Sequence, residues 1–199
     1  MAELKFKYGT MSSGKSLHLL SMAHQLKING IKYQLLKSAI DTRDNGVISS
    51  RIGIEESCIT ISSEDNICFH LQSLQSAGVK WLLVDEAQFL TPSQVDELAY
   101  IVDNYNINVI CYGLRTDYLT HLFDGSKRLF EIADSFEELP SYCECGNKNS
   151  VNARIDNNGI FDFKDGNQIE IGGDTRYKSI CRKCFTKAFI ENMQLADEI

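Results

Sequence analysis

Proline and tryptophan are scarce in this chain, with 2 and 1 residues among 199, and long hydrophobic runs are missing. The longest uncharged, mainly apolar stretches are residues 81–84 and 107–114, far below the roughly 20 residues that a membrane-spanning helix needs. Residues 1–8 alternate apolar and charged side chains and lack the apolar core of a secretory signal. We therefore expect a cytoplasmic protein with no membrane partner.

Basic residues are in the minority, and the cysteine count is odd. The sequence has 20 Lys and Arg against 27 Asp and Glu, a formal net charge of −7. An acidic chain gains no long-range attraction toward DNA or RNA, so we expect no nucleic-acid partner. Seven cysteines in a reducing compartment argue against a disulfide framework. The 43% hydrophobic and 24% charged residues are ordinary for a globular protein and exclude a disordered chain.

The hydrophobic pattern of the first two thirds predicts strands that alternate with helices. Such alternation is typical of an α/β fold, with a mainly parallel sheet flanked by helices. From Cys143 onward the pattern changes to short strand-like pieces, Asn-Gly and Asp-Gly turns and paired cysteines. We expect one domain over residues 1–140 and a small second domain over 141–199. Strands are expected at 4–8, 31–36, 81–84 and 109–112, a loop at 41–50, and helices at 15–28, after a cap at Ser62 or Ser63, and after a capping box at Thr91.

The segment between the first strand and the first helix matches the phosphate-loop pattern G-x-x-x-x-G-K-[ST]. Its glycines let successive backbone N–H groups face phosphate oxygens, and the helix that follows adds the positive end of its dipole. We expect Lys15 to reach the β- and γ-phosphates of ATP and the Ser16 hydroxyl to bind Mg²⁺. The first domain is therefore predicted to be a P-loop nucleotide-binding domain. The predicted nucleotide-binding residues of this loop are Gly9, Thr10, Met11, Ser12, Ser13, Gly14, Lys15 and Ser16.

Two carboxylates, Asp85 and Glu86, follow the apolar run 81–84. In a P-loop protein the second acid of the Mg²⁺ site lies at this edge of the sheet, opposite the phosphate loop. Adjacent side chains on a strand point to opposite faces, so the two acids are expected to do different work. We assign Asp85 to Mg²⁺ and Glu86 to general-base catalysis.

Four cysteines in the second domain form two close pairs, Cys143 with Cys145 and Cys181 with Cys184. Four thiolates from two turns suit a tetrahedral zinc ion, and a closed four-sulfur shell makes the metal structural. The C-x-C spacing of the first pair is tighter than the usual C-x₂₋₄-C, and independent reduced cysteines are the alternative. Cys58, Cys68 and Cys111 lie outside this pattern and are expected to be small core residues.

Four motifs in order resemble the type II, zinc-containing thymidine kinases, and most closely the bacterial branch of that family, whose members also carry a C-x-C first pair. The resemblance covers essentially the whole chain. The motifs are the phosphate loop at 9–16, Asp-Glu-Ala-Gln-Phe at 85–89, Gly-Leu-Arg-Thr-Asp at 113–117, and Ile-Gly-Gly-Asp-Thr-Arg-Tyr at 171–177 leading into the second cysteine pair.

This resemblance implies transfer of the γ-phosphate of ATP to the 5′-hydroxyl of thymidine, with deoxyuridine as a second substrate. It also implies a homotetramer whose small zinc-bearing lid domain closes a lasso loop over the nucleoside. By position, Glu86 corresponds to the catalytic base and Asp85 to the Mg²⁺-side acid. Further residues implied at the nucleotide site are Asp41, Arg43 and Gln88, and those implied at the nucleoside site are Phe89, Tyr118, Gln168, Ile169, Glu170, Ile171, Gly172 and Tyr177.

Three other functions fit parts of the sequence. Asp-Glu-Ala-Gln also resembles the acidic motif of helicases, which would make the chain a nucleic-acid-stimulated ATPase, but no basic stripe interleaves with aromatic residues as a single-strand groove requires. A zinc-bearing interaction module with a vestigial nucleotide site is a second alternative. A kinase of the same architecture that phosphorylates another nucleoside is the third.

Overall fold

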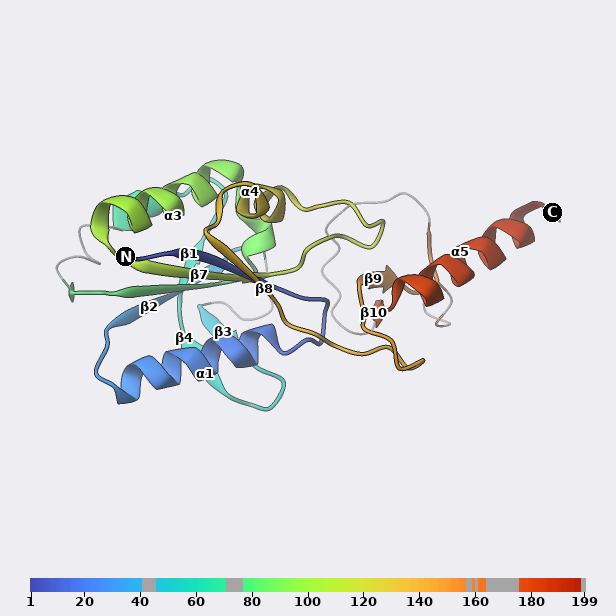
Figure 1. The fold of residues 1–199 in the computed structure, drawn as a ribbon, viewed down its shortest axis with the longest axis horizontal. Coiled ribbons are helices and arrows are strands. Elements are labelled where there is room, and N and C mark those ends of the chain that lie inside the picture. Colours follow the sequence, from blue (N-terminus) through green and yellow to red (C-terminus); the bar gives the residue numbers. More distant parts are fainter. Residues whose placement is uncertain (41–45, 71–76, 157–158, 160, 164–175, 198–199) are drawn as a thin grey trace.

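A six-stranded, all-parallel sheet forms the centre of the molecule, with strand order β5-β2-β6-β7-β1-β8 (Figure 1). The computed structural model describes residues 1–199 except 41–45, 71–76, 157–158, 160, 164–175 and 198–199, and leaves out the side chains of 70 and 193–197. Because parallel strands end at one edge of a sheet, the segments that follow β1, β6 and β7 come together there. The strands are β1 (Leu4–Tyr8), β2 (Tyr33–Ser38), β5 (Ile59–Ile61), β6 (Trp81–Asp85), β7 (Asn108–Gly113) and β8 (Ser135–Glu138).

Helices cover both faces of this sheet. α1 (Lys15–Ile28) lies on one face, and α3 (Pro92–Tyr105) and α4 (Asp124–Ile132) lie on the other (Figure 1). Two short 3₁₀ helices, η1 (Ile67–His70) and η2 (Ala87–Phe89), flank β6 in sequence. α3 begins with the expected capping box, since the Thr91 hydroxyl accepts a hydrogen bond from the Gln94 N–H and the Gln94 side chain accepts one from the Thr91 N–H.

The burial of strand β6 on both faces explains why its sequence is a continuous apolar run. Leu82 and Val84 are buried in the cluster beneath α3, and Leu83 is buried in the cluster beneath α1. A strand covered on both faces needs apolar residues at every position. Burying each of these side chains contributes about 1.5–3 kcal/mol to folding, so β6 is held firmly where it delivers Asp85 and Glu86 to the edge of the sheet.

The C-terminal part of the chain forms a separate small unit. β9 (Val151–Arg154) and β10 (Tyr177–Ile180) pair antiparallel, and α5 (Arg182–Asp197) extends away from the central sheet (Figure 1). Val151, Ala153 and Ile180 pack with Cys143 and Cys181 in a core of their own. We call β9, β10, α5 and the cysteine turn at 143–147 the C-terminal module.

Several sequence expectations need correction. The second strand runs from Tyr33 to Ser38 instead of 31–36, and residues 41–50, expected as a loop, include β3 (Val47–Ser49), which pairs with β4 (Glu55–Ser57). β8 was not expected, because its sequence Ser-Phe-Glu-Glu is that of a polar edge strand.

The helix expected after a cap at Ser62 or Ser63 first becomes helical, among the described residues, at Ile67, as the 3₁₀ turn η1. The Gln94 side chain donates hydrogen bonds to the Ser62 and Asp65 carbonyls and so ties residues 62–65 to α3. Residues 71–76 lie outside the described part of the chain.

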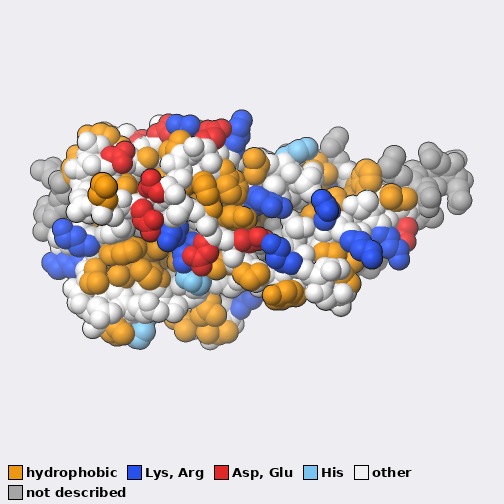
Figure 2. Space-filling model, viewed as in Figure 1, with side chains coloured by type: hydrophobic (Ala, Val, Ile, Leu, Met, Phe, Trp, Pro, Cys, Tyr) orange, Lys and Arg blue, Asp and Glu red, His pale blue; other side chains and the backbone are white. Residues whose placement is uncertain are grey.

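Two observations concern the charge on the surface and the length of the helices. On the face drawn in Figure 2, Lys and Arg side chains are interspersed with Asp and Glu side chains. Among the helices of the described residues, none combines the length and the apolar character needed to cross a membrane.

Candidate active site

The loop from Gly9 to Ser16 joins β1 to α1, as the phosphate-loop prediction requires. Gly14 has a φ of 78° and Ser12 a φ of 64°, both in the left-handed region. A Cβ on Gly9 would lie 2.6 Å from the Leu139 carbonyl oxygen, so only glycine fits there. α1 begins at this loop without a side-chain cap, which leaves the positive end of its dipole directed at the loop.

Lys15 folds back along the loop that precedes it. Its Nζ donates hydrogen bonds to the Thr10 carbonyl at 2.8 Å and to the Gly9 carbonyl at 3.3 Å. Burial lowers the pKa of Lys15, while the nearby carboxylates of Glu86 and Asp85 oppose that shift. The ammonium group therefore lies between the loop backbone and the two acids, where a phosphate chain would meet it.

Asp85 contacts the phosphate loop directly. The Ser16 hydroxyl donates a hydrogen bond of 2.9 Å to Asp85 Oδ2, although the two residues are 69 positions apart. Asp85 is only 3% exposed, and this burial, with the neighbouring charge of Glu86, raises its pKa to about 7. Two cis ligands of an octahedral Mg²⁺ at 2.0–2.1 Å are about 2.9 Å apart, so this oxygen pair has the spacing of a Mg²⁺ edge.

Glu86 differs from Asp85 in its backbone conformation and in its hydrogen-bond partner. Its backbone is left-handed, with a φ of 52°, at the turn from β6 into η2. Glu86 Oε2 accepts a 2.6 Å hydrogen bond from the Gln88 side-chain amide, whose oxygen accepts the Leu114 N–H at 2.9 Å. Gln88 is 2% exposed, so it links the acid to the end of β7 from within the core. Asp85 and Glu86 therefore contact different side chains, Ser16 and Gln88.

The aromatic residues implied at the nucleoside site lie in two places. Phe89 packs edge-to-face against Phe123, with ring centroids 5.7 Å apart. Tyr118 is 2% exposed, and the Arg154 guanidinium lies over its ring at 4.1 Å from the centroid. Tyr177 is the register partner of Arg154 in the β9–β10 pair, which places Tyr177 one strand away from the residue that covers Tyr118.

Seven other residues implied by the resemblance lie outside the described part of the chain, so their positions stay predictions. They are Asp41, Arg43, Gln168, Ile169, Glu170, Ile171 and Gly172.

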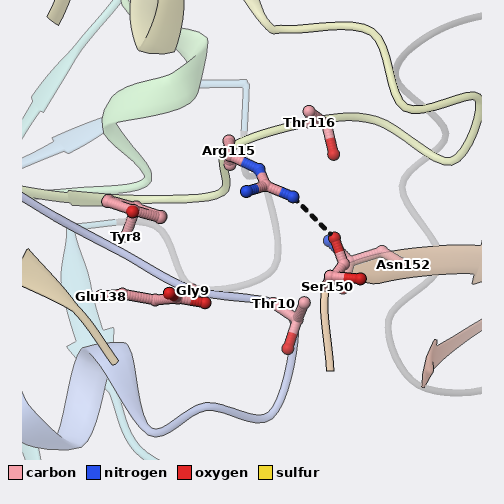
Figure 3. A pocket seen from close by; sticks show the side chains of 8 residues that line it. All are labelled: Tyr8, Gly9, Thr10, Arg115, Thr116, Glu138, Ser150 and Asn152. Atoms are coloured by element: carbon pink, nitrogen blue, oxygen red, sulfur yellow. Dashed lines mark hydrogen bonds between the residues drawn. The ribbon is translucent and has the colours of Figure 1, made fainter. Parts of the chain in front are cut away.

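The Gly-Leu-Arg-Thr-Asp motif connects the site to the C-terminal module. Arg115 Nη2 donates a 3.1 Å hydrogen bond to the Ser150 carbonyl, just before β9 (Figure 3). Asp117 Oδ1 accepts the N–H groups of Leu119 and His121 and so shapes the loop that carries Tyr118. Figure 3 shows Arg115 and Ser150 at a small hollow between the phosphate loop and the module, with Thr10 and Asn152 also on its wall.

Sequence reasoning missed four polar residues at this site. Lys37 is 4% exposed at the end of β2, in register with Asp85. Its place directly after the apolar residues of the expected second strand is the sequence feature that could have indicated it. Arg51, in the turn between β3 and β4, donates a 2.9 Å hydrogen bond to the Ser12 hydroxyl. Asn152 and Ser179 of the module bind the Met11 peptide. For the last three, sequence spacing carries no signal.

The four cysteines of the module come together as predicted. The sulfur atoms of Cys143, Cys145, Cys181 and Cys184 all lie within 4.8 Å of one another, and none of the chain's seven cysteines forms a disulfide. Four sulfurs around zinc at 2.3 Å are about 3.8 Å apart, so the cluster could hold this ion. Hydrogen bonds from Asn147 lower the pKa of the Cys145 thiol to about 6, which favours the thiolate that a metal needs. Cys111, fully buried, is a core residue as expected.

A phosphate loop that follows the first strand of a parallel sheet and contacts an acid at the end of β6, two strands away across β7, defines a P-loop nucleotide-binding protein. The family model "Thymidine kinase" matches residues 2–185, so this chain belongs to the thymidine kinase family.

Two thymidine kinases are similar to this chain over nearly its whole length. The thymidine kinase of Zymomonas mobilis is 43% identical over 93% of this chain and 96% of its own length. The thymidine kinase of Enterobacteria phage T4 is 45% identical over 92% of this chain and 95% of its own. Among solved structures, the Pif1 helicase from Candida albicans matches 69% of this chain with a TM-score of 0.42 and 13% identity, and this chain covers 36% of that helicase.

Proposed function

We propose that the protein is a thymidine kinase that transfers the γ-phosphate of ATP to the 5′-hydroxyl of thymidine, with deoxyuridine as a second substrate. Membership of the thymidine kinase family supports the substrates. The observation that carries the chemistry is the 2.9 Å hydrogen bond from Ser16 to Asp85, because it brings the phosphate loop into contact with the acidic end of β6.

In the proposed reaction, Glu86 accepts the proton of the thymidine 5′-hydroxyl. The 5′-oxygen then forms a bond to the γ-phosphorus as the bond to the β–γ bridging oxygen breaks, and ADP leaves. General-base assistance of this kind contributes about 10²–10⁴-fold in rate. The hydrogen bond from Gln88 helps to hold the Glu86 carboxylate in one orientation.

Charge on the phosphates is countered by the protein itself. Lys15 and the backbone amides of the phosphate loop neutralise the β- and γ-phosphates, and the half-buried position of Lys15 strengthens that attraction. Ser16 and Asp85 would hold Mg²⁺, which supplies further positive charge at the transferred group. Asp41 and Arg43 are proposed as additional phosphate-side residues, on the basis of the resemblance.

The nucleoside is proposed to lie between Phe89, Tyr118 and Tyr177, under a lasso formed by residues 168–172. The second domain expected at residues 141–199, which contains the C-terminal module, is then a lid whose closure excludes water and prevents wasteful hydrolysis of ATP. Zinc held by the four cysteines stabilises this lid and takes no part in the chemistry. We also propose a homotetramer that works in the cytoplasm, which size-exclusion chromatography with light scattering and cell fractionation would test.

The direct test is ADP release from ATP in the presence of a panel of nucleosides. We expect release with thymidine and, more slowly, with deoxyuridine. Release with a different nucleoside only would indicate another nucleoside kinase. Release stimulated by single-stranded DNA without any nucleoside would indicate an ATPase, and either result would overturn the proposal.

A further inference from the structure

The peptide groups on either side of Met11, in the first half of the phosphate loop, are held by the C-terminal module. The Met11 N–H donates a 2.7 Å hydrogen bond to Asn152 Oδ1 on β9, and the Met11 carbonyl accepts a 2.7 Å hydrogen bond from the Ser179 hydroxyl on β10. Asn152 and Ser179 are 141 and 168 positions away in sequence. We call these two side chains the loop clamp.

The loop clamp is built rigidly into the module. Asn152 and Ser179 are register partners in the β9–β10 pair, and their side-chain oxygens are 3.2 Å apart. The adjacent register pair in these strands is Val151 and Ile180, whose side chains are 4% and 2% exposed in the module core. Cys181, one of the four clustered cysteines, follows Ile180 directly. The clamp therefore has little freedom to move independently of the cysteine cluster.

The part of the loop that it holds is the part that the helix does not fix. Residues from Lys15 onward are ordered by α1, whereas Met11 precedes Ser12, whose φ of 64° is unusual for a residue other than glycine. Thr10 is tied to the same side of the molecule, since its hydroxyl lies 2.7 Å from that of Ser141. A phosphate loop binds only when its N–H groups are aimed correctly, so its first half needs such external support.

We propose that Asn152 and Ser179 are positioning residues for nucleotide binding: by holding the Met11 peptide they keep the phosphate loop in the shape that accepts the nucleotide's phosphates. The proposal rests on the proposed function only in taking the Gly9–Ser16 loop as the nucleotide site. It assigns the module a task at the phosphate loop, separate from covering the nucleoside. Neither side chain is required to touch a substrate for this effect.

The experiment measures ADP affinity by calorimetry on the full-length protein without any nucleoside. Ser179→Ala and Asn152→Leu each remove one hydrogen bond to Met11, together with the bond between Ser179 and Asn152, and are expected to weaken ADP binding about tenfold. Ser179→Thr and Asn152→Asp keep the hydroxyl donor and the oxygen acceptor, so they should restore affinity to within about threefold of the original protein. Lys178→Ala is the matched control, because Lys178 lies beside Ser179 on β10 but pairs with the exposed Glu144.

Zinc content and the thermal unfolding midpoint, measured on every variant, separate a local effect from loss of the module. Weaker ADP binding at unchanged zinc content, with recovery in the conservative variants, supports the clamp. ADP affinity within twofold of the original in both Ser179→Ala and Asn152→Leu would overturn it, as would equal losses in the conservative variants. If the unmodified protein binds no ADP, the proposed function itself fails, which is a distinguishable result.

Discussion

Gln88 and Glu86 are joined by a 2.6 Å hydrogen bond in which the side-chain amide of Gln88 donates to Glu86 Oε2. The other end of the Gln88 side chain accepts the Leu114 N–H, so its orientation is fixed by the end of β7. The acid assigned to proton abstraction is thus held by a buried residue two positions along the chain. We therefore propose that Gln88, expected only as a nucleotide-site residue, also orients the base.

Substitution of Gln88 should therefore reduce turnover. In Gln88→Met, Glu86 loses the hydrogen bond from Gln88 and the Leu114 N–H loses this acceptor, which costs about 1–3 kcal/mol of stability. We expect kcat to fall about 10–100-fold while KM for ATP changes by less than about threefold, measured by steady-state kinetics. Gln88→Glu keeps an acceptor for Leu114 but places a second charge beside Glu86, so its pH–rate profile should move to higher pH. Unchanged kinetics in both variants would remove Gln88 from this role.

Glu86→Gln tests the base itself. The substitution keeps the size of the side chain but removes its capacity to accept a proton, so kcat should fall at least about a hundredfold. ADP affinity should change little, because Glu86 is assigned to the hydroxyl and not to the phosphates. Near-normal turnover in this variant would assign proton removal to another group.

Asp85 predicts a pH dependence of stability in the metal-free protein. Its pKa of about 7 in the folded protein is above the 3.8 of an unperturbed aspartate. The folded state therefore binds a proton that the unfolded state releases between about pH 4 and pH 7, and over that range the carboxyl's contribution to stability is lost as pH rises. The Asp85→Asn variant does not lose stability in this way, because an asparagine side chain does not titrate. Its free energy of unfolding relative to the original protein should rise by on the order of 2 kcal/mol from pH 5 to pH 8 in urea titrations.

An exposed acid on α3 supplies the comparison for that experiment. Asp103→Asn changes the same functional group at a solvent-exposed position. Its stability difference should stay within about 0.5 kcal/mol over the same pH range. A flat difference for Asp85→Asn as well would show that burial does not retain the proton at Asp85.

Metal analysis tests the cysteine cluster. The purified protein should contain about one zinc ion per chain, and Cys145→Ser or Cys184→Ser should lower this to below about 0.2, because three thiolates hold the ion far less tightly than four. Cys58→Ser, outside the cluster, should leave the zinc content unchanged. A fully active protein without zinc would contradict the structural role of the metal.

Tyr177→Ala tests the nucleoside side of the site. Tyr177 is the register partner on β10 of Arg154, which covers the buried Tyr118, so we expect its side chain to reach the base of the nucleoside. We expect KM for thymidine to rise about tenfold with a smaller change in KM for ATP. Tyr142→Ala, at a tyrosine that is 71% exposed, should alter neither constant. Equal effects of the two substitutions would remove Tyr177 from the pocket.

The sequence correctly predicted those parts of the fold that are determined by a short pattern of neighbouring residues or by paired metal ligands. The continuous apolar run 81–84 predicted a strand covered on both faces, and Leu82, Leu83 and Val84 are buried in that way. Thr91 and Gln94 predicted a helix start to the residue. The spacing of the four cysteines predicted that their sulfur atoms lie close together, because such spacing is typical of residues that bind one metal ion.

The parts that did not follow depend on partners distant in sequence. β8 is a polar edge strand whose identity comes from pairing with β1, and the β3–β4 hairpin consists of three-residue strands. Arg51 reaches Ser12 only because that hairpin packs near the phosphate loop. Asn152 and Ser179 bind Met11 only because the C-terminal module packs against the phosphate loop. The spacing of these residues in the sequence gives no indication of that contact.

The most direct test of the central claim is to follow both products of one reaction mixture containing the protein, ATP, Mg²⁺ and thymidine. The account predicts that thymidine 5′-monophosphate and ADP form in equal amounts, and that Glu86→Gln lowers both together by at least about a hundredfold. ADP formed without the nucleotide product, or phosphate found on a position other than the 5′-hydroxyl, would contradict it.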